Sequence, residues 1–333
     1  MRAPVSLKSV YNKLVPGART LFVVPLIRYK YPKSDYLYLF YKEFIESNDP
    51  PKVSALSVFG HFKFVFTQLF GKPCILHYHW LEFQDKRALA GMIYKWFCLY
   101  LYKLFGGKLV WTVHNKMPHD NRFYKGNFLL RKWMAKNADL LHVHCDTAIY
   151  EISDFFNITK KKFFVISHPK FPAILIPRAA SAEALNQRFN LDLKSSDKIY
   201  LCFGNISAYK QLPNIANIFK KLEGNKKLII AGPVKKGQLD EYKALKEIKD
   251  QSENIFIIPQ FISEECVPEF FNTTDFVVFN YSEILTSGGV ELAKSYRKKI
   301  ILPLAGCLSE LKDQPNIISF TSQKELEQIL QST

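Results

Sequence analysis

DFVVFNYSEILTSGGVELAKSYRKKIILP, residues 275–303, is the stretch of this 333-residue sequence that decides its fold. Its apolar run at 276–281 predicts a strand, and its Ser-Gly-Gly at 287–289 predicts the start of a helix. A strand, a glycine-containing turn and a helix start make a cradle for phosphate, because the unpaired N–H groups of the helix and its dipole attract anions. Glu283 and Glu291 lie around this turn, and a carboxylate one helical turn further on can accept hydrogen bonds from ribose hydroxyls. The stretch predicts a nucleotide-diphosphate site.

The same alternation of short apolar runs and longer amphipathic segments continues along the whole chain. Such alternation is typical of parallel strands joined by helices. We expect strands at residues 21–25, 53–59, 74–80, 108–114, 140–145, 163–167, 199–206, 227–231, 254–259, 275–281, 300–304 and 317–320. We expect helices at residues 36–47, 61–70, 86–105, 126–137, 147–156, 212–222, 238–250, 264–272, 288–297 and 323–330. These elements predict an α/β protein with two doubly wound parallel sheets, whose strand C-termini face each other across a cleft where ligands bind.

The length of the chain sets the number of domains. A chain of 333 residues is too long for one ordinary core and fits two domains of roughly 150 residues each. A run of prolines followed by a polar stretch marks the connection between them. We predict an N-terminal Rossmann-like domain at 1–175, a linker at 176–197 and a C-terminal Rossmann-like domain at 198–333.

Composition places the chain among globular proteins. Hydrophobic residues make up 48%, and 14 glycines are too few for a fibrous chain. The six cysteines are scattered without metal-type spacing, and several lie in apolar runs, which favours a reducing cytosol over a disulfide scaffold. No apolar run reaches the roughly 18 residues of a membrane span, and the first residues lack the apolar core of a signal peptide. We therefore expect a protein that does not cross a membrane.

The positive charge is concentrated in the first half. Residues 1–176 carry 26 Lys and Arg against 11 Asp and Glu, a net of +15, and the remainder has 20 against 19, a net of +1. All eight histidines also lie in the first half. A basic half indicates a polyanionic partner, either nucleic acid, anionic lipid head groups or a phosphate-bearing substrate, and a merely soluble basic surface is the alternative. No nucleic-acid-reading motif is present, so we expect no nucleic-acid partner.

Two segments of the first half combine aromatic residues with lysines. They are HFKFVFTQLFGK at 61–72 and KRALAGMIYKWFCLYLYKLFGGK at 86–108. An apolar stripe with Trp, Tyr and flanking Lys is typical of helices that lie in the interface of a bilayer. The alternative is that both helices cover the sheet, with their aromatic side chains in the core. We predict contact with an anionic membrane surface.

Four segments carry a resemblance to a known family. They are WTVHNKMPHD at 111–120, FGNISAYKQL at 203–212, SEILTSG at 282–288 and PLAGCLSEL at 303–311. Together with the spacing of Glu283 and Glu291, they resemble the retaining GT-B glycosyltransferases of family 4, in the branch that builds bacterial exopolysaccharide and capsule. The similarity is nearly continuous over residues 199–311 and patchy before them. It implies the GT-B architecture of two Rossmann-like domains facing a central cleft.

The resemblance implies a donor site in the second half. Lys210 is expected on the donor diphosphate, where a cation offsets the charge that develops on the leaving group. Glu291 is expected to hold the ribose, and Glu283 the hydroxyls of the sugar. The other expected donor contacts are Gly204, Asn205, Pro259, Phe261, Ser287, Gly288 and Gly289.

Two departures from the family pattern concern this donor site. The arginine that often helps to hold the diphosphate is absent, with Asn205 or Ser207 in its place. The glycine that follows the lysine is Gln211. These departures point to weaker turnover or to another basic residue as a substitute, and they support an alternative, a non-catalytic GT-B subunit.

In the first half the resemblance points to His114, at the end of an expected strand. In the family this histidine contacts the donor sugar near the reacting centre, and Asn115 and His119 are the next candidates for acceptor contacts. The His-x-His pairs at 77–79 and 142–144 offer alternate residues on one strand face, but nothing in the sequence brings the two pairs together, as zinc would require. GT-B enzymes need no catalytic metal, and no DxD motif is present, so we expect no metal and no cofactor.

The resemblance implies a retaining, metal-independent hexosyltransferase with catalytic residues His114, Lys210 and Glu283. It leads us to expect a UDP- or GDP-linked sugar as the donor and a lipid-pyrophosphate-linked saccharide as the acceptor, in bacterial surface polysaccharide synthesis. We expect the protein in the cytoplasm, peripheral on the inner face of the cell membrane. The alternative subunit binds a nucleotide sugar or a partner enzyme without turnover.

Overall fold

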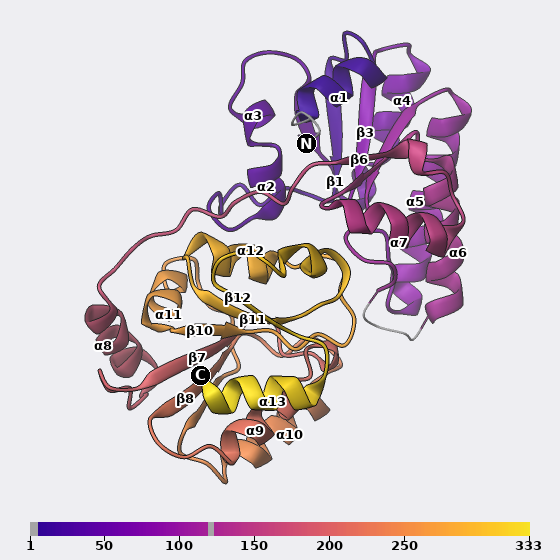
Figure 1. Ribbon diagram of the computed structural model, residues 1–333. Coiled ribbons are helices and arrows are strands. Elements are labelled where there is room, and N and C mark those ends of the chain that lie inside the picture. The colour runs from indigo at the N-terminus through magenta and orange to yellow at the C-terminus, as the bar shows by residue number, and fades with distance from the viewer. Residues whose placement is uncertain (1–5, 119–122) are drawn as a thin grey trace. The chain divides into compact units, whose positions relative to one another are not determined.

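The computed structural model describes residues 6–118 and 123–333, and the chain divides into two α/β units, residues 1–169 and 170–333 (Figure 1). Each unit contains a six-stranded sheet in which neighbouring strands run parallel. Helices connect successive strands, which is the doubly wound arrangement expected from the alternation in the sequence. The prediction of two Rossmann-like α/β domains is confirmed.

The first unit contains all the strands predicted for the first half of the chain. Its strands are β1 (Thr20–Val24), β2 (Lys52–Ala55), β3 (Cys74–Tyr78), β4 (Lys108–Thr112), β5 (Leu140–Val143) and β6 (Phe163–Val165). Its helices are α1 (Leu7–Leu14), α2 (Tyr36–Phe40), α3 (Lys42–Ile45), α4 (Phe62–Leu69), α5 (Lys86–Leu104), α6 (Tyr124–Asn137) and α7 (Asp146–Phe156). The strand order is β2-β1-β3-β4-β5-β6.

Two layers of helices cover the two faces of this sheet (Figure 1). On one face, α1, α2 and α3 pack against Leu21 and Val23 of β1, with Tyr11 of α1 in the same core. On the other face, Phe22 of β1 meets Phe64 of α4, with ring centroids 6.3 Å apart. Side chains alternate between the faces along each strand, so the two layers have separate apolar cores.

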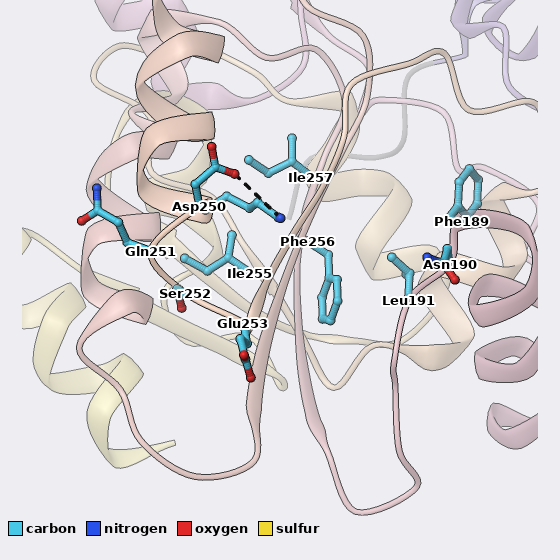
Figure 2. Close-up of a pocket in the computed structure, with 11 residues that line it drawn as sticks. Phe189, Asn190, Leu191, Asp250, Gln251, Ser252, Glu253, Ile255, Phe256 and Ile257 are labelled. Atoms are coloured by element: carbon cyan, nitrogen blue, oxygen red, sulfur yellow. Dashed lines mark ion pairs between the residues drawn. The ribbon is translucent and has the colours of Figure 1, made fainter.

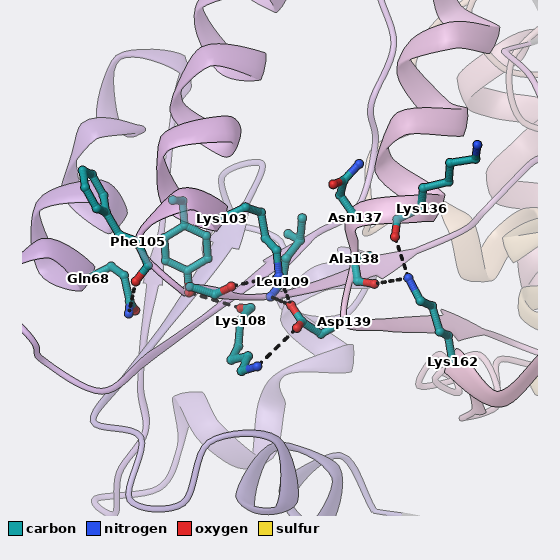
Figure 3. A network of polar contacts seen from close by, with 12 residues as sticks. Gln68, Lys103, Phe105, Lys108, Leu109, Lys136, Asn137, Ala138, Asp139 and Lys162 are labelled. Carbon is teal, nitrogen blue, oxygen red and sulfur yellow. Dashed lines mark hydrogen bonds and ion pairs between the residues drawn. The ribbon is translucent and has the colours of Figure 1, made fainter. Parts of the chain in front are cut away.

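A partly buried ion-pair network fixes the C-terminal end of α5 to the sheet (Figure 3). Asp139, which precedes β5, accepts hydrogen bonds from the ammonium of Lys103 at 2.6 Å and from the N–H of Leu109 at 2.8 Å. The ammonium of Lys108 lies 3.4 Å from the same carboxylate. Burial opposes ionisation of Asp139, but these donors outweigh it and lower the pKa of its carboxyl group.

The second unit also contains every strand that the sequence predicts. Its strands are β7 (Lys198–Phe203), β8 (Lys226–Ala231), β9 (Ile255–Ile258), β10 (Phe276–Val278), β11 (Lys299–Pro303) and β12 (Ile317–Phe320). Its helices are α8 (Arg178–Phe189), α9 (Leu212–Lys220), α10 (Leu239–Lys249), α11 (Val267–Thr273), α12 (Gly288–Ser295) and α13 (Gln323–Ser332). The strand order is β12-β11-β10-β7-β8-β9, and it reverses between β10 and β7. Ligands of open α/β sheets bind at such a switch point, outside the C-terminal ends of the strands.

The segment predicted as a linker, residues 176–197, contains helix α8. Leu185 of this helix is buried in the core of the second unit, where α8 packs against α11. Arg178 at its start forms an ion pair with Asp275 and donates a hydrogen bond to the carbonyl oxygen of Asp197 at 2.6 Å. The alanines of RAASAEALNQRF favour a helix over a loop.

Candidate functional site

The loops that carry Lys210 and Glu283 meet at the switch point of the second unit. Lys210 follows β7, and Glu283 follows β10. The N–H of Ser282 donates a hydrogen bond to the carbonyl oxygen of Tyr209 at 2.8 Å. The rings of Tyr209 and Tyr281 stack, with centroids 5.6 Å apart. The structure therefore brings both predicted donor loops to one edge of the sheet.

Lys210 is a buried cation. Only 9% of its surface is exposed, and its ammonium donates a hydrogen bond to the carbonyl oxygen of Phe203 at 3.0 Å. Burial lowers the pKa of Lys210 to about 8, so the ammonium form prevails at neutral pH. None of the ion pairs among the described residues involves Lys210, so no carboxylate there balances its charge. A buried charge without a counter-ion is unfavourable, so the position suits a bound anion.

Two glycines allow the backbone to approach this ammonium closely. Gly204 has φ 91°, and a Cβ at this position would lie 3.1 Å from Nζ of Lys210. Gly232, which follows β8, has φ 145°, and a Cβ there would lie 2.5 Å from the carbonyl oxygen of Gly204. Only glycine fits both positions without moving the backbone.

The start of α12 provides N–H donors on the other side of the switch point. Ser287 caps the helix, because its Oγ accepts a hydrogen bond from the N–H of Val290 at 3.3 Å. The same Oγ lies 2.8 Å from the hydroxyl of Tyr281, which fixes its position. With the N–H of Val290 engaged, the N–H groups of Gly288 and Gly289 remain for an anion at the positive end of the helix dipole.

The two glutamates differ in their surroundings. Glu291, on the first turn of α12, forms an ion pair with Lys294 at 3.0 Å, and 21% of its side chain is exposed. Glu283 is exposed, and none of the described ion pairs involves it. Glu283 is therefore accessible, whereas one carboxylate oxygen of Glu291 is engaged by Lys294.

The PLAGC segment, residues 303–307, packs against the loop that carries Glu283. Gly306 has φ 52°, and a Cβ there would lie 2.4 Å from the carbonyl oxygen of Ile284. The N–H of Cys307 donates a hydrogen bond to the carbonyl oxygen of Leu285 at 2.8 Å. The glycine in this motif therefore lets one loop press against the other.

A loop that the sequence analysis did not single out lies beside this site. The N–H of Ile206 donates to the carbonyl oxygen of Pro233 at 2.9 Å, and the N–H of Lys235 donates to the carbonyl oxygen of Ile206 at 3.0 Å. Lys235 and Lys236 thus adjoin the segment in which the family pattern places an arginine. The available signal was a pair of lysines directly after a predicted strand, in GPVKKG.

The second departure, Gln211, has a visible structural consequence. Its backbone is left-handed, with φ 47° and ψ 39°. Glycine adopts this conformation without strain, whereas a side chain is unfavourable there. Of the residues in place of the arginine, Asn205 is exposed and Ser207 is buried.

The nucleotide base was expected near Pro259 and Phe261, and both side chains are exposed at the C-terminal end of β9. A pocket of about 590 Å³ lies at the opposite, N-terminal end of the same strand (Figure 2). It is lined by the connection from α10 to β9, by Phe189 at the end of α8 and by Leu191 just after that helix. Because ligands of such sheets bind at strand C-termini, this pocket is not the expected donor site.

In the first unit the two His-x-His pairs converge at the C-terminal ends of β3 and β5, although nothing in the sequence indicated this. His77 and His142 both contact the hydroxyl of Thr112 on β4, at 2.7 and 2.9 Å. The rings of His79 and His144 lie beyond them, and the ring of His144 contacts that of His142, with centroids 4.7 Å apart. All four side chains lie on the sheet face that α1, α2 and α3 cover.

Tyrosines from the covering helices complete this network. The hydroxyl of Tyr41 lies 2.6 Å from Nδ1 of His77 and 2.7 Å from Nε2 of His79. The hydroxyl of Tyr36 lies 3.2 Å from Nε2 of His144. Every nitrogen of the four paired histidines has a hydrogen-bond partner. Within residues 6–118 and 123–333, no three His, Cys, Asp or Glu side chains are arranged to hold a metal ion. The expectation of a metal-free protein stays a prediction.

His114 lies at the outer edge of the network, two residues after β4. Its Nε2 is 3.2 Å from Nδ1 of His79, and its ring stacks on Trp80 with centroids 4.5 Å apart. His114 and the four paired histidines form one cluster, which comprises His77, His79, His114, His142 and His144. Burial lowers the pKa of each of these histidines well below the usual value, so the rings are neutral at pH 7.

Beside His114, two buried polar atoms have no hydrogen-bond partner among the described residues. They are Oδ1 of Asn115 and Nε of Arg131. Arg131 of α6 is 4% exposed, donates to the carbonyl oxygen of Asn115 at 2.8 Å and lies 3.4 Å from Glu82. Burial lowers the pKa of Arg131 to about 10. Nothing in the sequence distinguishes this buried cation from the lysines around it. His119, the other expected acceptor contact, lies outside the described residues.

Comparisons with known proteins bear on the fold. No protein-family model matches the sequence, and no curated protein sequence matches it significantly. HepE from Anabaena, solved with UDP and glucose, is 14% identical, with 95% of this chain and 89% of that chain covered and a TM-score of 0.67. Sucrose-phosphate synthase from Thermosynechococcus elongatus is 13% identical, with 99% and 86% covered and a TM-score of 0.63. The fold is GT-B.

The GT-B assignment extends to a third structure, a glycosyltransferase from Rickettsia africae. It is 12% identical, with 94% of this chain and 87% of that chain covered and a TM-score of 0.61. All three comparisons include both units of this chain. Among the helices of the described residues, none has both the length and the apolar character needed to span a bilayer.

Proposed function

We propose that this protein is a retaining, metal-independent glycosyltransferase. Its donor is a UDP- or GDP-linked sugar, and its acceptor is a lipid-pyrophosphate-linked saccharide in bacterial surface polysaccharide synthesis. The observation that carries the proposal is the buried ammonium of Lys210, which lacks a carboxylate partner among the described residues and lies at the switch point of a GT-B fold. Support also comes from HepE, which has been solved with UDP-glucose.

The proposed chemistry assigns each loop of the second unit a role. Lys210 and the N–H groups at the start of α12 stabilise the diphosphate as it leaves with the electron pair of the broken glycosidic bond. Glu291 holds the ribose and Glu283 holds the sugar hydroxyls. The acceptor hydroxyl attacks on the face from which the diphosphate leaves and gives its proton to a phosphate oxygen, so no protein nucleophile is needed. In the first unit, His114 contacts the sugar and Asn115 the acceptor.

The first test identifies the donor and then removes the ammonium. A thermal-shift screen with UDP, GDP, ADP and their sugars selects the nucleotide, since a ligand that binds only the folded state raises the melting temperature. We expect Lys210→Met to reduce kcat/KM for donor hydrolysis about 100- to 1000-fold, the usual effect of losing one group that stabilises a leaving charge. Because the change removes an uncompensated buried charge, the variant should melt no lower than the parent.

Lys243→Ala is the matched control, because Lys243 lies on α10 of the same unit and 64% of its side chain is exposed. We expect its hydrolysis rate to equal that of the parent. Hydrolysis by Lys210→Met within threefold of the parent would remove Lys210 from the site and refute the proposal.

The departures at the donor edge favour a second candidate, a GT-B subunit that binds a nucleotide sugar or a partner enzyme without turnover. The left-handed Gln211 and the absent arginine are the observations behind it. Donor hydrolysis that disappears in Glu283→Ala would favour the enzyme. Tight nucleotide binding with no hydrolysis and no transfer to membrane-extracted lipid would favour the subunit.

The proposed function places the protein in the cytoplasm, peripheral on the inner face of the cell membrane. A lipid-linked acceptor is presented at that face, and both its pyrophosphate and the anionic leaflet attract a basic domain. The net charge of +15 over residues 1–176 supports this location.

A further inference from the structure

Helix α5 is apolar on its outer face as well as its inner face. Met92, Leu99 and Tyr102 point inward and are buried. The outer face exposes five large apolar side chains at helical spacing, Ile93, Trp96, Phe97, Tyr100 and Leu104. A helix that covers a sheet normally presents charged and polar residues to water, and one that is apolar all round is in contact with something besides water.

A groove between α5 and α6 continues this apolar face. It has a volume of about 360 Å³, and none of the described residues that line it is charged. Phe83 and Met92 form its buried floor. Ile93 on one side and Leu129 on the other form exposed rims, with 60% and 66% of their surfaces accessible. The groove is therefore open to the surface along an apolar mouth.

Two tryptophans bound the same groove. Trp96 of α5 and Trp133 of α6 contact each other edge to face, with ring centroids 5.9 Å apart. Tryptophan is enriched where a protein meets the interface of a bilayer, because its ring is apolar and its N–H seeks a polar partner. We therefore expect these two rings to lie near the level of the lipid head groups when a hydrocarbon chain occupies the groove.

The floor of the groove is held in place by specific contacts. The side chain of Asn127 is buried, accepts a hydrogen bond from the N–H of Phe83 at 3.1 Å and donates one to its carbonyl oxygen at 2.9 Å. Gly126 brings the helix close to the Phe83 ring, because a Cβ at this position would lie 2.7 Å from it. These contacts make the groove part of the folded unit and not a chance gap between side chains.

The charge around the groove selects its occupant. Among the described basic side chains of α5 and α6, Lys95 and Lys132 are partly exposed and Lys125 and Lys136 are exposed, and neither helix contains Asp or Glu. A second copy of this surface would bring like charges together, which is unfavourable. An anionic bilayer offers both hydrocarbon for the apolar face and negative head groups for the lysines.

We propose that the outer faces of α5 and α6 form a bilayer-binding surface and that the groove between them takes a hydrocarbon chain of an anionic membrane lipid. This surface would hold the protein at the membrane, where the proposed function places it. The biological purpose of the binding rests on the proposed function, whereas the binding itself does not. Ile93 and Leu129 insert among the chains, and the accessible lysines Lys95, Lys125, Lys132 and Lys136 contact the head groups.

The test measures binding of the full chain to vesicles. We expect the protein to sediment with vesicles of phosphatidylcholine and phosphatidylglycerol at 3:1 in 100 mM salt, and less with phosphatidylcholine alone. The double variant Ile93→Glu with Leu129→Glu should reduce the partition coefficient about tenfold or more, because two exposed apolar anchors become anions. Leu239→Glu is the matched control, since Leu239 is 56% exposed on α10 of the second unit, and its partition should be unchanged.

A second measurement reports on the groove itself. Lipids brominated on their acyl chains quench tryptophan only at short range, so they should quench the bound parent protein and quench a Trp96→Phe, Trp133→Phe variant much less. Trp80 and Trp111 remain in that variant, and Trp111 is buried. Vesicle binding without such quenching would mean attraction by charge alone and would overturn the groove assignment.

Other outcomes would also overturn the inference. These are equal vesicle binding by the parent and the double glutamate variant, or self-association without lipid that the same variant abolishes. Donor hydrolysis in solution separates this inference from the proposed function. If the double variant hydrolyses donor like the parent but loses vesicles, the surface is supported; if no protein hydrolyses donor, vesicle binding is still decided by the partition measurement.

Discussion

The two units share a six-stranded parallel sheet but differ in how the polar groups buried near its C-terminal edge are balanced, since the buried Arg131 of the first unit has Glu82 at 3.4 Å. The first unit buries neutral histidines that satisfy one another and nearby tyrosines. The second unit buries the cation Lys210 with no carboxylate beside it among the described residues. A satisfied neutral network is stable without a ligand, whereas an uncompensated ammonium is stabilised by one. The histidine network of the first unit is therefore stable without a ligand, whereas the surroundings of Lys210 in the second unit favour a bound anion.

The surfaces of the two units also differ, both in exposed apolar area and in net charge. Of the exposed large hydrophobic side chains among the described residues, seventeen belong to the first unit and four to the second. The first half also carries nearly all the net positive charge. An apolar and basic exterior suits a membrane, and a nearly neutral exterior suits a unit that binds a small soluble anion.

Acid should produce the largest difference in stability between the two units. In the folded first unit burial holds the pKa of five histidines well below 6.5, so the unfolded chain binds more protons as pH falls below that value. The stability these groups contribute is present above about pH 6.5 and is lost progressively below it, by at most about 1.4 kcal/mol per pH unit for each histidine. We therefore expect the unfolding free energy of the first unit to fall between pH 6.5 and 5.5.

Urea unfolding at several pH values measures this difference. All four tryptophans lie in the first unit, so fluorescence reports on that unit, and circular dichroism follows both. The second unit contains no histidine and should hold its midpoint over the same range. Equal shifts of both transitions, or a fluorescence transition that does not move, would contradict the account of the buried network.

A smaller effect should follow from breaking the Asp139 network. Asp139→Asn leaves the ammonium of Lys103 without its partner and weakens the bond to the N–H of Leu109, so the first unit should lose about 2 kcal/mol of unfolding free energy. The pKa of Asp139 is lowered in the folded state, so its contribution is present above the usual aspartate pKa and fades only as pH falls below it. The loss should therefore be the same at pH 7.5 and 6.

Asp49→Asn is the control for this change. Asp49 lies 3.9 Å from Lys8, and 76% of its side chain is exposed, so its removal should leave the urea midpoint unchanged. If both variants behave alike, the network does not fix α5 to the sheet. A shift in the transition of the second unit would show that the two units do not unfold separately.

The strands and most helices could be predicted because their signals are local. Apolar runs bounded by turns located all twelve strands, and the cap at Ser287 followed from Ser-Gly-Gly after a strand. Helix α1 was missed because LKSVYNKL is short and half polar, although Ser6 caps it by accepting a hydrogen bond from the N–H of Ser9 at 3.1 Å. Helix α8 was missed because polar residues after prolines resemble a linker.

The parts of the site that could not be predicted depend on contacts between distant segments. The two His-x-His pairs lie about sixty residues apart, and only the strand order brings them to one hydroxyl on β4. The chain has 46 Lys and Arg residues, and nothing in the sequence distinguishes Arg131 or Lys235 from the others. In the structure, Arg131 differs by its burial, and Lys235 differs by the hydrogen bond from its N–H to the carbonyl oxygen of Ile206. The resemblance located Lys210, but its burial without a counter-ion is visible only in the fold.

The smallest expected effect concerns the strained position beside that lysine. Gln211 is left-handed, and a non-glycine residue in this conformation costs roughly 1–2 kcal/mol, whereas glycine loses about half to one more in chain entropy on folding. Gln211→Gly should therefore raise the unfolding free energy of the second unit by about 0.5–1 kcal/mol and leave the first unit unchanged. Asn190→Gly is the control, because Asn190 has φ 52° but asparagine tolerates this conformation, so the gain should be smaller. A loss of stability in Gln211→Gly would show that the side chain does more than its 3.3 Å hydrogen bond to Gln323 implies, and a faster donor hydrolysis would show that the strain limits the loop of Lys210.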